Sequence, residues 1–248
     1  MAFPHDKMEV YVINLDRSPE RLERMKRRLG KLGIPFVRVA GADGKSRPFV
    51  AGKDYSPKKY SLAAGKQTTP TEIGCYISHY TVMEKFLRSS AKPFALIIED
   101  DMAFSDDLPD ILDALAARSD WDMVKLNGSH RGGYVCKRSL TPRYRLAKNL
   151  FHQSKSGAYV INRRAAERYV AKLLPMFVPL DHEFVKFWKY GLRGFCLTPF
   201  PAREEGADTT IDYKALRLTR KPWWKRLPTA LYKSWIALRR AFYVAFDI

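Results

Sequence analysis

The chain has 248 residues, which is enough for one domain with a large core or for two small domains. Hydrophobic residues make up 46% of it and aromatic residues 13%, a composition that excludes an intrinsically disordered protein. The formal net charge of +18 favours negatively charged partners such as nucleic acid, anionic lipid or phosphorylated ligands.

The cysteines and the N-terminal residues indicate in which cellular compartment the protein is expected. Cys75, Cys136 and Cys196 show no Cys-x-x-Cys spacing, which predicts reduced structural thiols in a cytosolic protein and no zinc site. Residues 1–8 lack the apolar core of a signal peptide, and no uncharged apolar run reaches about 18 residues. We therefore expect a protein that is neither exported nor threaded through a membrane.

Strand and helix patterns alternate along the chain, as in α/β proteins. The first strand, helix and second strand form a unit of the length that a parallel crossover requires. Segments 45–70 and 128–150 are rich in Gly, Pro and basic residues and are predicted to be irregular. The predicted strands are 10–15, 35–39, 94–98, 123–126, 158–161 and 195–197, and the predicted helices are 19–31, 72–87, 163–173 and 181–190.

Three acidic residues, Glu99, Asp100 and Asp101, follow the buried-strand pattern at 94–98. Ligands gather at the carboxyl ends of strands in open α/β sheets, and adjacent carboxylates are costly unless a cation neutralises them. In an extended segment, Glu99 and Asp101 point to one side and Asp100 to the other. The pattern predicts Glu99 and Asp101 as ligands of a divalent cation, the alternative being an ordinary acidic turn after a strand.

Three segments resemble the bacterial glycosyltransferase family 25, the lipooligosaccharide β-galactosyltransferases and their glucosyltransferase relatives. They are Val12–Arg21, Glu72–His79 and Ile97–Asp101. The resemblance extends over residues 8–210, in the order and spacing of the family. Thr71, Tyr80 and Met83 stand where the family usually has Gly, Leu and Trp, which leaves the sugar and the acceptor open.

The resemblance implies a GT-A-type α/β fold, a single nucleotide-binding domain with a mostly parallel central sheet. It also implies a UDP-sugar donor and a divalent metal, Mn²⁺ or Mg²⁺. Together with their positions at strand ends and on the helix 72–87, the resemblance predicts donor-binding residues at Asn14, Leu15, Arg17, Arg21, Asp43, Ser78, His79, Asp100 and Lys125. For Lys125, which follows another strand, contact with the acceptor is the alternative.

Several of these positions have a plainer alternative. Arg17 and Arg21 are expected either to bind a diphosphate at the end of the first strand or to form an ordinary solvated helix face. Asp43 suits a ribose hydroxyl or a turn before Gly44. His79 suits donor phosphate or a packed, hydrogen-bonded histidine.

Asp181 is the candidate general base, because an attacking sugar hydroxyl must lose its proton and a positioned carboxylate accepts it. The alternative role is a helix N-cap, for which aspartate is well suited.

Residues 211–248 form a basic arm with nine Lys or Arg against two Asp. Its apolar residues fall on one helical stripe, Leu231, Trp235, Leu238, Phe242 and Phe246. Tryptophan, cations and an apolar stripe predict a helix that lies on an anionic membrane surface. The alternative is a last helix whose stripe packs on the domain.

We therefore expect an inverting glycosyltransferase that moves a hexose, galactose or glucose, from a UDP-sugar to a lipooligosaccharide or other lipid-linked acceptor. We expect it at the inner face of the cytoplasmic membrane. One alternative is a non-catalytic relative that binds sugar nucleotides. A basic nucleic-acid-binding protein would explain the arm but not the strand-end carboxylates, so we expect no nucleic-acid partner.

Overall fold

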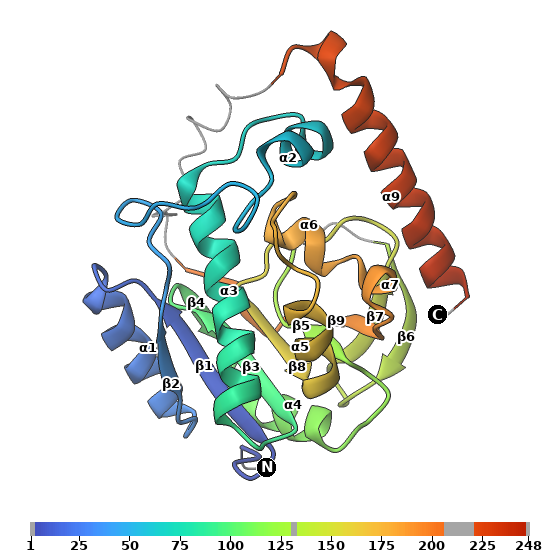
Figure 1. Ribbon diagram of the computed structural model, residues 1–248. Coiled ribbons are helices and arrows are strands. Elements are labelled where there is room, and N and C mark those ends of the chain that lie inside the picture. Colours follow the sequence, from blue (N-terminus) through green and yellow to red (C-terminus); the bar gives the residue numbers. More distant parts are fainter. Residues whose placement is uncertain (1–2, 130–132, 206–220, 247–248) are drawn as a thin grey trace.

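The computed structural model describes residues 3–129, 133–205 and 221–246 (Figure 1). Its centre is an eight-stranded sheet of order β2-β1-β3-β8-β5-β9-β7-β6. Strands β4 (Met102–Phe104) and β10 (Ala202–Glu204) form a separate antiparallel pair. The strands of the large sheet are β1 Met8–Asn14, β2 Val37–Ala40, β3 Phe94–Glu99, β5 Met123–Lys125, β6 Tyr134–Ser139, β7 Arg145–Asn149, β8 Ala158–Asn162 and β9 Gly194–Thr198.

Six of these eight strands run in one direction. Strand β8 is antiparallel to both β3 and β5, and β7 is antiparallel to both β6 and β9, while the remaining pairs are parallel. The predicted α/β fold with a mostly parallel central sheet is therefore confirmed.

Helices cover both faces of the sheet (Figure 1). Alternation along β1 sends Val10 and Val12 toward one face, where they share a core with Met25 of α1 and residues of α4. Tyr11 and Ile13 point to the opposite core, which α3, α5 and α7 cover. The helices are α1 Pro19–Lys31, α2 Pro57–Ala64, α3 Pro70–Ser89, α4 Leu108–Ala116, α5 Arg163–Val170, α6 Leu180–Phe184, α7 Phe187–Tyr190 and α9 Leu227–Ala245, preceded by a 3-10 turn, Trp223–Arg226.

The structure corrects the sequence-based elements at three places. Strands β6 and β7 occupy much of segment 128–150, which was expected to be irregular; β6 carries polar and half-exposed side chains, so its pattern shows no buried face. Helix α2 lies inside segment 45–70, with Pro57 at its start and a left-handed Gly65 at its end. The expected helix 181–190 is two short helices, α6 and α7.

Helix α9 packs on the domain through one face. The hydroxyl of Thr229 donates to the carbonyl of Leu62 at 2.7 Å. The Tyr243 hydroxyl donates to the carbonyl of Leu192 at 2.9 Å and accepts from the amide of Gly194 at 2.8 Å. These bonds anchor both ends of α9 to the rest of the domain.

The predicted apolar stripe lies on the other face of α9 and is exposed. Leu231 keeps 63% of its surface accessible and Trp235 keeps 56%; Leu238, Phe242 and Phe246 are also exposed. The helix thus packs on the domain while the stripe itself does not. Within residues 3–129, 133–205 and 221–246, no helix combines the length and apolarity needed to cross a bilayer.

Candidate functional site

The loop that follows β2 is held tightly against helix α3. A Cβ atom on Gly74 would lie 2.3 Å from the carbonyl oxygen of Ala42, so only glycine permits this approach. The Ser78 hydroxyl accepts from the Ala42 amide at 2.8 Å and donates to the Gly74 carbonyl at 2.7 Å. The loop presents Asp43, whose Oδ2 lies 2.7 Å from Nε of Arg17. Ser78 therefore positions the loop that carries Asp43, a predicted donor-binding residue paired with Arg17.

A capping box fixes the start of α3. Thr69 Oγ1 accepts from the Glu72 amide, and the Glu72 carboxylate accepts from the Thr69 amide, each at 3.3 Å. Lys66 adds an ion pair to Glu72 at 2.6 Å. The side chains one and two turns farther along, Cys75 and His79, are thereby held at the end of β3.

Asp100 is held by side chains from the end of β1 and the start of α1. It is buried, and its Oδ2 accepts a hydrogen bond from Nδ2 of Asn14 at 2.7 Å. Its Oδ1 lies 3.1 Å from a guanidinium nitrogen of Arg21. Asn14 is itself oriented by Arg38, which donates to its Oδ1 at 3.0 Å. Asp100 thus binds the ends of β1 and α1 and is already neutralised by Arg21.

Glu99 lies beside a buried histidine. Its Oε1 is 3.0 Å from Nε2 of His79, whose Nδ1 is 2.8 Å from the Tyr159 hydroxyl. His79 is almost fully buried and has protein partners at both ring nitrogens, so it is a packed, hydrogen-bonded histidine in this structure. Its predicted contact with donor phosphate stays a prediction.

Cys75 completes a group of three possible metal-ligand types with His79 and Glu99, whose donor atoms lie within 4.8 Å of one another. Burial, and then the charge of Glu99, raise the pKa of the Cys75 thiol well above its ordinary value. The thiol is therefore protonated at neutral pH, and a metal would have to displace that proton to bind it.

Asp101 shares the guanidinium group of Arg21 with Asp100, at a longer distance. Its Oδ1 is buried and has no hydrogen-bond partner among the described residues. Arg21 lies 3.9 Å from its other oxygen. Burial, followed by the charges of Glu99 and Asp100, raises the pKa of Asp101 to about 7. A carboxylate oxygen without a partner in the described chain, two positions after Glu99, is an oxygen ligand of the type that hard divalent cations bind.

Asp181 lies in the first turn of α6, which begins at Leu180 after Pro179, so Asp181 is not the N-cap of this helix. Its Oδ1 accepts from the His182 amide at 2.9 Å, and its Oδ2 lies 3.7 Å from Nε2 of His152. His152 was not predicted from the sequence, because it lies in a loop with no periodic pattern and comes close to Asp181 only in the tertiary structure.

The surroundings of Asp181 keep it ionised. Burial acts to raise its pKa, but interactions with His152, His182 and Lys125 outweigh burial and hold the pKa below the ordinary aspartate value. Burial lowers the pKa of His182 to about 4, so this imidazole is neutral at neutral pH. Asp181 and the two histidines also place three possible metal-ligand atoms within 4.8 Å of one another.

The strand-end carboxylates and Asp181 share one region of the molecule. The charges of Glu99, Asp181 and Asp101 all act on the thiol of Cys75. The ring of Phe184 in α6 lies 6.1 Å from the ring of His79, which contacts Glu99, so the end of β3 and helix α6 lie near the same part of α3. Residues 82 positions apart in the chain are thus brought to one candidate site.

A family model described as glycosyltransferase family 25 (LPS biosynthesis protein) matches residues 7–183. The chain belongs to glycosyltransferase family 25. Procollagen galactosyltransferase 1 of Danio rerio is 28% identical over 214 residues, which cover 80% of this chain and 35% of that protein. The inactive glycosyltransferase 25 family member 3 of Mus musculus is 25% identical over 246 residues, covering 87% and 40%. The chain thus spans less than half the length of these curated relatives.

A solved structure of a Drosophila β-1,4-galactosyltransferase 7 in complex with manganese, UDP-Gal and xylobiose also shows similarity. Its sequence is 12% identical, the match covers 87% of this chain and 80% of that chain, and the TM-score is 0.42.

The predicted donor-binding residues of this family 25 chain separate into two locations. Asn14, Leu15, Arg17, Arg21, Asp43 and Asp100 gather at the carboxyl ends of β1, β2 and β3. Lys125, at the end of β5, instead donates through Nζ to the carbonyl of Gln153 at 2.8 Å and lines a pocket beneath α9. Its role in donor binding stays a prediction.

Proposed function

We propose that this chain is the catalytic domain of an inverting glycosyltransferase that moves a hexose, galactose or glucose, from a UDP-sugar to a glycan hydroxyl. The convergence of Glu99, Asp101 and Asp181 on one space is the observation that carries the proposal. Two sets of carboxylates serve the two halves of the reaction, because one stabilises the leaving diphosphate through a cation while the other accepts a proton. Membership of family 25 supports the same reaction class.

The donor nucleotide occupies the carboxyl ends of β1 and β2, where ligands collect in open α/β sheets. Asp43 accepts a hydrogen bond from a ribose hydroxyl, and the guanidinium groups of Arg17 and Arg21 face the diphosphate. Their present ion pairs with Asp43 and Asp100 hold both guanidinium groups at this edge of the sheet.

Mn²⁺ or Mg²⁺ is the proposed cofactor, held by Asp101 with Glu99 assisting. The unpartnered Oδ1 of Asp101 supports this assignment. When bound, the cation would offset the negative charge that develops on the departing diphosphate.

Asp181 accepts the proton of the acceptor hydroxyl. As that hydroxyl oxygen forms its bond to the anomeric carbon, the bond from the anomeric carbon to the UDP oxygen breaks and UDP leaves with the electron pair. Attack from the face opposite the leaving group inverts the anomeric centre. The lowered pKa of Asp181 keeps the carboxylate ready as proton acceptor.

The proposed acceptor is a lipooligosaccharide or another lipid-linked glycan, met at the inner face of the cytoplasmic membrane. The exposed stripe of α9 supports this part of the proposal, because large apolar side chains in a row on a protein surface mark interaction sites. Exposed Lys225 and Arg239 beside the stripe suit anionic headgroups.

The deciding experiment incubates the full chain with UDP-galactose, UDP-glucose and other UDP-sugars, an acceptor glycoside and Mn²⁺ or Mg²⁺. We expect UDP release with one hexose donor and a product whose anomeric configuration, measured by NMR, is inverted. UDP-sugar binding without turnover on any acceptor would favour the non-catalytic alternative.

The membrane part is tested by co-sedimentation with vesicles of anionic or neutral lipid. The variant Trp235→Ser/Leu238→Ser changes exposed residues only, so it should fold and lose vesicle binding. Equal sedimentation of the variant and the wild type would contradict the membrane role. Binding should weaken as salt rises, because headgroup attraction is screened.

A further inference from the structure

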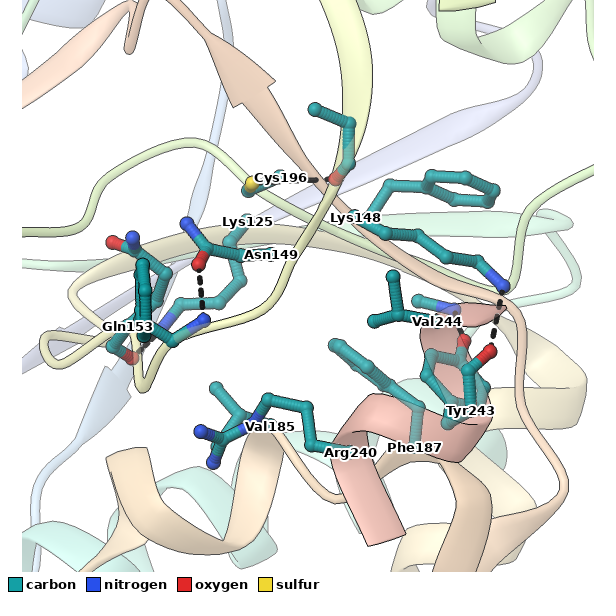
Figure 2. Close-up of a pocket in the computed structure, with 14 residues that line it drawn as sticks. Lys125, Lys148, Asn149, Gln153, Val185, Phe187, Cys196, Arg240, Tyr243 and Val244 are labelled. Atoms are coloured by element: carbon teal, nitrogen blue, oxygen red, sulfur yellow. Dashed lines mark hydrogen bonds between the residues drawn. The ribbon is translucent and has the colours of Figure 1, made fainter. Parts of the chain in front are cut away.

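A cationic pocket lies between the central sheet and α9, apart from the strand-end carboxylates (Figure 2). It encloses about 390 Å³ of empty space, including the part open to solvent. Three of its lining residues are basic, Lys125, Lys148 and Arg240, and none of the described residues that line it is acidic. A pocket with this lining has an excess of positive charge.

Arg240 lines this pocket and has a hydrogen-bond donor that no described residue satisfies. It projects from α9, retains only 8% of its accessible surface, and has a buried Nε without a hydrogen-bond partner. Among the described residues, none forms an ion pair with its guanidinium group. Burial lowers the pKa of Arg240, because removing a cation from water costs free energy.

Two further donors face the pocket from the sheet side. Lys125 is buried and uses one of its three N–H groups for the carbonyl of Gln153 at 2.8 Å. Nδ2 of Asn149 is buried and has no partner within the described chain. Figure 2 shows Lys125, Asn149 and Gln153 across the pocket from Arg240. Burial lowers the pKa of Lys125 to about 8, and the charge of Arg240 acts in the same direction.

Buried hydrogen-bond donors and unpaired buried cations are costly, so native proteins satisfy them. No protein carboxylate among the described lining residues does so here. The missing group must supply negative charge and acceptor oxygens to donors from β5, β7 and α9 at once.

We propose that this pocket binds an oxyanion, a phosphate or carboxylate group, held by Lys125, Asn149 and Arg240. Charge-assisted hydrogen bonds to such an anion are the strong ones, and a guanidinium matches the geometry of both groups. Because Arg240 belongs to α9 and Lys125 to the sheet, the bound anion links the C-terminal helix to the catalytic domain.

The pocket adjoins the candidate base. Gln153 follows His152 in the chain, and His152 lies 3.7 Å from Asp181. The charge of Asp181 also acts on Lys125. The oxyanion therefore comes either from solution or from an acidic sugar or phosphorylated sugar of the acceptor, and the second source rests on the proposed function.

The first experiment measures phosphate binding to the full chain by calorimetry and thermal unfolding, at constant ionic strength set with chloride. We expect saturable binding and a higher Tm in phosphate for the wild type. In Arg240→Met, phosphate affinity should fall by about 10-fold or more, because one charge-assisted contact is lost. The matched control is Arg239→Met, since Arg239 is exposed and lies over the Trp235 ring.

Misfolding is separated from loss of the ligand by the phosphate-free measurement. There Arg240→Met should be at least as stable as the wild type, because it removes a buried, unpaired cation. Absence of saturable binding of phosphate and of acetate to the wild type would overturn the proposal. Equal phosphate stabilisation of Arg240→Met and the wild type would also overturn it.

The second experiment distinguishes the sources of the anion by comparing a neutral acceptor glycoside with the same glycoside carrying a phosphate or a carboxylate. A lower KM for the charged acceptor, with that preference lost in Arg240→Met, assigns the anion to the acceptor. Phosphate binding without any acceptor preference assigns it to a free anion. If no acceptor is turned over, the proposed function fails while the calorimetry still tests the pocket.

Discussion

Asn14 and Asp100 join the carboxyl ends of β1 and β3 through a buried hydrogen bond of 2.7 Å. This bond, with the ion pair from Arg21 at 3.1 Å, fixes the position of the Asp100 carboxylate. Asp100 therefore joins β1, α1 and β3, while the binding of a cation by Glu99 and Asp101 stays a prediction.

Asp101→Asn should remove the cation site and leave the fold intact. We expect at least about 10²-fold lower kcat, because the cation supplies several kcal/mol of leaving-group stabilisation. The Tm should not fall, because the substitution replaces a buried carboxylate whose Oδ1 has no partner. Chelator should silence the wild type, and exposed Asp106→Asn is the control. Full activity of Asp101→Asn in chelator would refute the metal assignment.

Asp181→Asn should lower kcat by about 10² to 10⁴-fold, because the amide keeps the size of the side chain but cannot accept the proton. Donor affinity should hardly change, since Asp181 lies on α6 and not at the ends of β1 and β2. Steady-state kinetics together with calorimetry of UDP-sugar binding check this. Unchanged turnover would exclude Asp181 as the base.

Gly74→Ala should destabilise the protein and weaken donor binding. The new methyl group would lie 2.3 Å from the Ala42 carbonyl oxygen, so the loop that carries Asp43 must move. Overpacking of this kind costs about 1–3 kcal/mol of unfolding free energy. Gly30→Ala on α1 is the matched control, because nothing lies within 4 Å of its Cβ position. It should add roughly 0.5–1 kcal/mol, and equal effects of the two substitutions would contradict the tight contact.

Asp122 should stabilise the fold in a pH-dependent manner. Burial acts to raise its pKa, but hydrogen bonds from Arg193 and Asn162 outweigh burial and hold the pKa below the ordinary value. A lowered folded-state pKa gives stability that is complete above the unfolded pKa of about 4 and is lost as the pH falls through the folded pKa.

Denaturant unfolding of Asp122→Asn and the wild type tests this from pH 7 downward. At pH 7 the variant should be about 1–2 kcal/mol less stable, because the buried carboxylate loses charge-assisted hydrogen bonds, although its partner Arg193 is half exposed. The difference should shrink below about pH 4. A difference that is constant with pH would show that the Asp122 charge contributes no stability.

Local patterns in the sequence determined much of the scaffold. The apolar run at 94–98 and the helical pattern at 19–31 predicted β3 and α1 as they are observed, because hydrophobic periodicity and helix boundaries are set by neighbouring residues. The acidic triplet and the family resemblance also identified the sheet edge. Strands β6 and β7 were not predicted, because their half-exposed residues show no clear alternation of apolar and polar positions.

The tertiary structure alone decided which side chains meet. His152 faces Asp181, and Arg240 faces Lys125, across pairs of elements that no local pattern connects. It also decided that α9 packs through Tyr243 while Trp235 stays exposed. The physical reason is that a residue's hydrogen-bond partner, burial and pKa depend on contacts between distant segments, which form only when the sheet orders them in space.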